Sequence, residues 1–169
     1  DEPYELFASE VWSDDPWFID QEKRDFINNE GYWVMNAGTA KGQTVGSHGR
    51  CLSALQGTQY WPGFKDSILL IEEDAETNPA LFDRILQSFI QLPDFSGVKG
   101  LLIGRFQKDS KMTRELLAKI IETKPELKSI PVVANVNLGH TLPLSTLPIG
   151  GEIEITATSE NAKILVIKH

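Results

Sequence analysis

The stretch SILLIEEDAETNPALFDRILQSFIQL, residues 67–92, combines a buried strand with an amphipathic helix. Its first six residues are mostly apolar, as in strands that are buried on both faces of a parallel sheet. Asn78 can cap a helix through its side chain, and Pro79 suits the first helical position because its φ is already helical. The apolar residues that follow keep helical spacing, at Leu81, Phe82, Ile85, Leu86, Phe89 and Ile90. The stretch therefore predicts a strand followed by a helix that packs against it.

The same alternation continues along the chain. VKGLLIGRF (98–106) predicts a second buried strand, SKMTRELLAKIIETK (110–124) a second helix, and IPVVANV (130–136) a third strand. The order strand–helix–strand–helix–strand implies two right-handed crossovers and three parallel neighbours. The tail GEIEITATSENAKILVIKH (151–169) predicts an antiparallel hairpin with a turn near residues 159–161. We therefore expect an α/β domain with a parallel core sheet and a C-terminal antiparallel hairpin.

The first third of the chain has a weaker pattern. Residues 1–30 are aromatic and acidic without a clear period, which predicts mostly loop with a short helix at 21–28. A short strand is expected at Tyr32–Asn36, between two glycines. Glycine-rich chain follows to Gly49, and RCLSALQG (50–57) predicts a short helix that ends at its glycine.

The composition is that of an acidic globular protein. A chain of 169 residues suits one domain with a substantial core. The net charge of −8 argues against a nucleic-acid or anionic-membrane surface, which needs a basic face. The single cysteine, Cys51, allows no internal disulfide, no apolar run reaches the length of a membrane span, and no signal peptide opens the chain. We expect a cytoplasmic protein, and its start at DEPYELF without methionine indicates processing or a piece of a longer protein.

Polar residues follow all three predicted parallel strands, in the position where open α/β sheets bind ligands. Glu72 ends the first strand, Arg105 ends the second, and His140 follows the third. A carboxylate that meets an imidazole there can fix its tautomer and leave the other ring nitrogen free to act as a base. Each residue also has a structural interpretation. His140 could be a satisfied structural histidine, Glu72 could cap the next helix, and Arg105 could pair with the acidic run EEDAE (72–76).

A Glu–His pair needs a nucleophile, and none is evident. No serine lies in a G-x-S-x-G elbow. Ser47 comes closest but stands in glycine-rich chain, and Cys51 lies inside a predicted helix. His48, which is flanked by glycines, is interpreted as a loop residue, and no metal-ligand spacing or phosphate-binding loop is present. We therefore predict no metal and no cofactor.

Three segments carry a family resemblance: GTQYWPGFKDSILLIEEDAE (57–76), VKGLLIGRF (98–106) and IPVVANVNLGHTLPLSTLPIGG (130–151). In this order they resemble the C-terminal domain of serine peptidases of the LD-carboxypeptidase family. WSDDPWFIDQ (12–21) and LIGRFQ (102–107) are similar to the branch that contains the microcin C immunity peptidase. The resemblance implies a layered β/β/α domain of the swivelling type over residues 1–169. It also implies a Ser-Glu-His triad whose Glu and His are Glu72 and His140, and whose serine lies in a separate N-terminal domain absent from this chain.

The resemblance further implies the substrate and the partners. In the immunity branch the substrate is an aminoacyl-nucleotide antibiotic, and in the carboxypeptidase branch it is the L,D bond of a murein peptide. Trp17 or Trp12 would stack on the nucleotide base, although either could equally belong to the core. The expected partners are the N-terminal nucleophile domain and a second copy in a homodimer, and this chain alone is expected to be inactive. The alternative is a binding or dimerisation domain without catalysis.

Two positions depart from the family pattern. The branch usually carries Asp-Phe before the Gly-His pair, whereas this chain has Asn137-Leu138, so a negative charge near the expected base is lost. The usual Gly-Gly-Asn-Leu appears as Gly49-Arg50-Cys51-Leu52, which places a bulky cation in a normally open turn.

Overall fold

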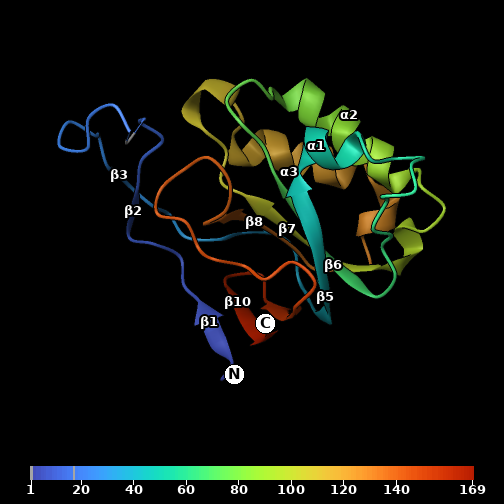
Figure 1. The fold of residues 1–169 in the computed structure, drawn as a ribbon. Coiled ribbons are helices and arrows are strands. Elements are labelled where there is room, and N and C mark those ends of the chain that lie inside the picture. Colours follow the sequence, from blue (N-terminus) through green and yellow to red (C-terminus); the bar gives the residue numbers. More distant parts are fainter. Residues whose placement is uncertain (1, 17) are drawn as a thin grey trace.

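The computed structural model describes residues 2–16 and 18–169, and the centre of this part is an eight-stranded mixed sheet (Figure 1). The strand order is β1-β10-β9-β5-β6-β7-β8-β4, and β2 and β3 form a separate two-stranded ribbon. The strands are β1 (Tyr4–Leu6), β2 (Val11–Trp12), β3 (Ile27–Asn28), β4 (Trp33–Asn36), β5 (Gly38–His48), β6 (Ser67–Glu72), β7 (Val98–Gly104), β8 (Val132–Val136), β9 (Glu152–Ala157) and β10 (Ala162–Lys168). The helices are α1 (Gly49–Ser53), α2 (Pro79–Ile90) and α3 (Arg114–Glu122), with 3-10 turns at Phe95–Gly97, Lys108–Ser110 and Pro125–Leu127.

The predicted α/β core is confirmed. Strands β6, β7 and β8 are parallel neighbours, and β9 and β10 form the predicted antiparallel hairpin. The first crossover helix, α2, begins where the sequence indicates, and the second, predicted over 110–124, forms as the shorter α3. The Asn78 side chain accepts a hydrogen bond from the Leu81 N–H at 3.0 Å, and the Thr113 side chain caps α3 by accepting from Leu116 at 3.2 Å. These bonds satisfy amide groups that the first helical turn leaves without partners.

Apolar side chains cover both faces of the parallel strands. On one face, which all three helices cover (Figure 1), Leu69 and Ile71 of β6 pack with Phe82 and Phe89 of α2. On the other face, Ile68 and Leu70 of β6 join a second apolar cluster that includes Ile153, Ile155, Ile164 and Val166 of the hairpin. The alternation along β6 follows from the period of two in a strand. None of the described helices is long and apolar enough to cross a membrane.

Strand β5 is the main element that the sequence analysis missed. It has eleven residues and changes partners at Gln43: its first half pairs antiparallel with β9, and its second half pairs parallel with β6. Glycine and polar residues dominate it, so it lacks the β-branched and aromatic run that marks a strand. Gly46 explains part of this composition, since a Cβ there would collide with the carbonyl oxygen of its register partner Leu70.

The helix predicted at residues 21–28 is wrong. The segment forms turns and then β3, which pairs antiparallel with β2 through Ile27–Trp12 and Asn28–Val11. Its apolar residues are too few to build a buried helical face, so pairing with the preceding segment determines its conformation. The strand predicted at Tyr32–Asn36 is confirmed as β4. The short helix predicted within 50–57 is confirmed as α1, which starts at Gly49 and gives way to turns after Ser53.

We expect Gly46→Ala to destabilise the protein strongly. The added Cβ meets backbone atoms of Leu70, which cannot move without breaking the β5–β6 ladder, so the loss should be about 3 kcal/mol or more, at the upper end of overpacking effects. Urea unfolding measures it. Gly100→Ala is the matched control, because its Cβ would meet mobile methyl groups of Ile155 and Ile68 at 3.1 Å. Equal losses for the two variants would contradict the backbone clash.

Candidate active site

Glu72 and His140 meet at the carboxyl edge of the parallel strands. Glu72 is the last residue of β6, and His140 lies on the connection that follows β8. The distance from His140 Nδ1 to Glu72 Oε2 is 2.8 Å, so the predicted geometry of the pair is confirmed. The His140 side chain is 48% exposed and that of Glu72 is 19% exposed. Within residues 2–16 and 18–169 nothing bonds His140 Nε2, which leaves that nitrogen available to a reacting group.

Gly139 allows this approach. Its φ is +90°, a conformation that L side chains rarely adopt, and a Cβ at this position would collide with the Glu72 carboxylate. The residues on either side anchor the turn, since Leu138 N–H donates to the Val136 carbonyl at 2.6 Å and Ser145 N–H donates to the Asn137 carbonyl at 2.8 Å. The turn therefore brings the His140 ring back over the end of β6.

His48 is a second histidine at the same place, and the sequence analysis did not assign it to the site. It ends β5 in register with Glu72, so the prediction that it lies in a loop is wrong. Its ring contacts the His140 ring edge-to-face, with centroids 5.7 Å apart. Its Nε2 lies 3.4 Å from Asp74 Oδ2 and 3.6 Å from Glu73 Oε2. The sequence analysis missed His48 because it predicted no strand before Gly49, and it is the pairing of that strand with β6 that places His48 beside Glu72.

The acidic run after β6 does not cap α2. No acidic residue lies in the first turn of α2, and Asn78 is its cap. Arg50 instead binds this run, with Nη2 at 2.5 Å from Asp74 Oδ2 and Nη1 at 3.3 Å from Glu76 Oε2. Burial opposes ionisation of Asp74, but the Glu76 N–H and the Arg50 charge together lower its pKa. The bulky cation at position 50 is therefore held by carboxylates.

Glu73, the residue after Glu72, is buried, with 2% of its surface exposed. Burial raises its pKa, although the Thr77 hydroxyl, which donates to Oε2 at 2.9 Å, and the neighbouring His48 act against this shift. Its other oxygen, Oε1, has no hydrogen-bond partner among the described residues. Glu73 is thus held partly desolvated next to the Glu72–His140 pair.

Arg105 does not pair with the acidic run, so that interpretation is wrong. It is 2% exposed and, among the described residues, forms no ion pair with a carboxylate. Its acceptors are the side chains of Asn135, Asn137 and Thr141, and burial lowers its pKa to about 10.

The structure describes one of the two tryptophans that the resemblance assigns to the nucleotide base, Trp12. Trp12 is half-buried with Arg105 Cζ 5.4 Å from its ring centroid, and it lines a cavity of about 360 Å³ that does not include His140. Trp17 lies outside the described residues. The cavity that His140 lines has a volume of about 430 Å³, and its wall includes Phe18 and Asp15. Phe18, which is 73% exposed, is therefore the described aromatic residue of the 12–21 segment that faces this cavity, and the sequence analysis did not select it.

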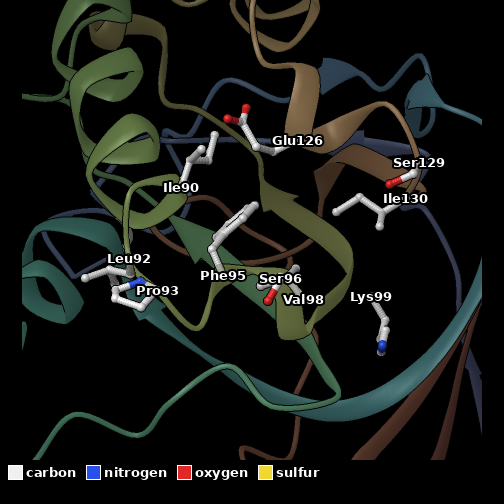
Figure 2. A pocket seen from close by; sticks show the side chains of 10 residues that line it. All are labelled: Ile90, Leu92, Pro93, Phe95, Ser96, Val98, Lys99, Glu126, Ser129 and Ile130. Atoms are coloured by element: carbon white, nitrogen blue, oxygen red, sulfur yellow. The ribbon is translucent and has the colours of Figure 1, made fainter.

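A further pocket lies at the opposite end of the strands and lacks a comparable constellation. It is about 530 Å³ and opens at the start of β7 around Val98 and Phe95 (Figure 2). Its charged lining residues, Lys99 and Glu126, lie apart from each other (Figure 2). Ligands of open α/β sheets bind beyond the carboxyl ends of the strands, so the Glu72–His140 edge is the better candidate.

Comparisons with known proteins agree with this fold. The family model of the LD-carboxypeptidase C-terminal domain matches residues 41–155. The predicted carboxypeptidase YocD of Bacillus subtilis (strain 168) is 49% identical over the whole chain, which covers 52% of that protein. The crystal structure of an MccF-like protein from Bacillus anthracis has a TM-score of 0.96 at 45% identity, over 99% of this chain and 52% of that one.

The microcin C7 self-immunity protein MccF of Escherichia coli is more distant. It is 23% identical over 95% of this chain and 48% of its own length. Its complex with glutamyl sulfamoyl guanosine shares the fold with a TM-score of 0.79 at 22% identity, over 100% of this chain and 51% of that one. The chain thus spans about half the length of the relatives it matches.

Glu73→Gln should raise the melting temperature at neutral pH. Because the folded-state pKa of Glu73 lies above the ordinary value of 4.5, the folded protein binds an extra proton between the two values and loses stability as pH rises through that window. Glutamine lacks this penalty, so its advantage should shrink as pH falls and vanish below 4.5. Thermal unfolding from pH 4 to pH 8 measures it, with exposed Glu122→Gln as the control. An advantage independent of pH would contradict the desolvation of Glu73.

Proposed function

Since the chain belongs to the LD-carboxypeptidase family of serine peptidases, as its C-terminal domain, we propose that it supplies two members of a Ser-His-Glu triad. In this proposal His140 is the general base and Glu72 is the carboxylate that orients it. The observation that carries the proposal is the 2.8 Å contact between His140 Nδ1 and Glu72 Oε2, with Nε2 left open. That arrangement fixes the tautomer in which Nε2 can accept a proton.

The nucleophilic serine would come from the remainder of a longer protein. The chain covers about half of its relatives, and an N-terminal nucleophile domain is the proposed partner. In the first step, His140 Nε2 takes the proton of the serine hydroxyl while the serine oxygen attacks the carbonyl carbon of the substrate amide. The Glu72 carboxylate then stabilises the imidazolium, which returns the proton to the leaving amine. Water hydrolyses the acyl-enzyme by the same base, and the 169 residues alone should be inactive.

The proposed substrate is an amide bond in a small molecule. MccF, the distant relative, is named for self-immunity to microcin C7, and its structure is known with glutamyl sulfamoyl guanosine. We propose for this chain either the amide bond of an aminoacyl-nucleotide antibiotic of the microcin C type or an L,D-peptide bond of a murein peptide. A cavity of about 430 Å³ beside His140 has room for part of such a ligand, with Phe18 as an aromatic wall. The exposed free thiol of Cys51 suits a reducing compartment, which supports a cytoplasmic setting.

In the whole protein, His140→Ala should lower kcat by about 10⁴-fold or more, because the members of a triad act as a unit. Glu72→Gln keeps the shape but removes the charge that stabilises the imidazolium, so a comparable or somewhat smaller loss is expected. Turnover of an aminoacyl sulfamoyl adenylate and of a murein tetrapeptide measures both. His169→Ala is the control histidine, because its ring stacks on Tyr4 instead. Full activity of His140→Ala would leave the chain as a binding or dimerisation domain.

Phe18→Ala should weaken binding of nucleotide-bearing ligands by about 1–3 kcal/mol, since loss of a stacking face has this effect. Trp17→Ala is made in parallel to test the role predicted for that residue. Calorimetric titration of the whole protein with a non-hydrolysable aminoacyl-nucleotide analogue and with a murein peptide measures the selectivity. Phe26→Ala is the matched control, because Phe26 is exposed and contacts Arg24. Equal losses on both ligand classes would mean that neither ring recognises the base.

A further inference from the structure

Arg105 is a buried cation whose neighbours are neutral. It directly follows β7 with 2% of its surface exposed, and its guanidinium donates to three side-chain oxygens. The Nε–Asn135 Oδ1 distance is 3.0 Å, the Nη2–Asn137 Oδ1 distance is 2.5 Å, and the Nη1–Thr141 Oγ1 distance is 3.4 Å. Removing a charge from water without an opposite charge is unfavourable, so this arrangement is not explained as a gain in stability.

The three acceptors share one property: all lie in β8 or on the connection after it that carries His140. Asn135 belongs to β8, Asn137 follows the strand, and Thr141 comes directly after His140. Asn135 has a φ of +59°, which is sparsely populated for residues other than glycine and persists only where the surroundings hold it. The planar fork of one guanidinium therefore contacts the chain on both sides of the turn at Gly139, through Asn135 and Asn137 before it and Thr141 after it.

Other contacts set which way the two amides face. Asn135 Nδ2 donates to Asn29 Oδ1 at 2.8 Å and to the Gly31 carbonyl at 2.7 Å. Asn137 Nδ2 donates to the Phe7 carbonyl at 3.1 Å. Because their NH₂ groups are used in this way, the oxygens of both amides must face Arg105.

Trp12 and Ser13 make further contacts with Arg105 and with the chain just after His140. Trp12 stacks over the guanidinium, with Arg105 Cζ 5.4 Å from its ring centroid. The next residue, Ser13, exchanges two backbone hydrogen bonds with Leu142, at 2.9 and 2.8 Å. His140 thus lies between residues that Arg105 holds and a residue that the Trp12–Ser13 segment holds.

We propose that Arg105 is a positioning residue for His140: its guanidinium holds residues 135–141 in the one arrangement that brings His140 Nδ1 onto Glu72 Oε2. Trp12 acts in the same unit as the cover of the guanidinium. The role rests on the proposed function of the Glu72–His140 pair, but its geometric part can be tested without any turnover. A merely structural Arg105 would affect unfolding and leave the His140 ring as it is.

The test compares Arg105→Lys with wild type in the whole protein with ¹⁵N-labelled histidine. Lysine keeps the charge but cannot reproduce the fork, so it cannot hold three acceptors in fixed directions. NMR should show that the hydrogen-bonded Nδ1 proton of His140 is lost and that its ring nitrogens report a mixture of tautomers, while the His169 signals stay in place. Arg84→Lys, at an exposed position of α2, is the matched control and should leave the His140 signals unchanged.

Thr141→Val is the milder variant, for the case that Arg105→Lys does not fold. It removes only the hydroxyl acceptor next to His140 and nearly preserves the shape. It should weaken the same proton signal in part. An unchanged His140 spectrum in a folded variant of either kind would overturn the proposal, even if its melting temperature falls.

Turnover provides the second arm. If the proposed function is right, Arg105→Lys should lower kcat by about 100-fold with little change in KM, because a misplaced base affects the chemical step rather than binding. A wild-type protein without hydrolase activity would refute the proposed function, and the NMR comparison would still decide the role of Arg105. Normal turnover in Arg105→Lys beside an active wild type would refute the positioning role.

Discussion

Parallel pairing of β5, β6, β7 and β8, with apolar side chains on both faces, is the constraint on which the other features depend. Parallel strands with buried faces need crossovers that cover the sheet, which accounts for α2 and α3. The same pairing brings the carboxyl ends of all four strands to one edge. The backbone there must leave the sheet and turn, so polar side chains can gather where the core ends.

That edge concentrates ionisable groups in a small, half-exposed volume. Glu72 and His140 form the central pair, and His48 packs its ring against His140. Glu73 and Asp74 lie beside the His48 ring, with opposite shifts in pKa: burial raises that of Glu73, whereas contacts with Arg50 and the Glu76 N–H lower that of Asp74. Neighbouring carboxylates thus differ because one is desolvated and the other is bound by charge and by N–H groups.

The sequence by itself determined the β6–α2–β7–α3–β8 core, the C-terminal hairpin and the location of Glu72 and His140 at one edge of the sheet. These features depend on periodicity and helix caps, which a short window of sequence contains, and on the general right-handedness of crossovers. Topology indicated only that both residues lie at the same edge, since parallel strands joined by consecutive crossovers end there, and the family resemblance paired them. The turn at Gly139 brings His140 onto Glu72. Family motifs added the likeness to LD-carboxypeptidases, which the matches to known proteins confirm.

Only the tertiary structure decided where β5 runs, and with it the place of His48. A strand of small and polar residues has no local sequence pattern that identifies it. Its composition is set by the close approach of a neighbouring backbone, as at Gly46. Tertiary structure also decided that Arg105 donates hydrogen bonds to two amides and a hydroxyl instead of pairing with the acidic run at 72–76. It likewise decided that Phe18 faces the His140 cavity. The physical reason is common to these cases. The partners are far apart in sequence, and burial selects among contacts that composition leaves equally possible.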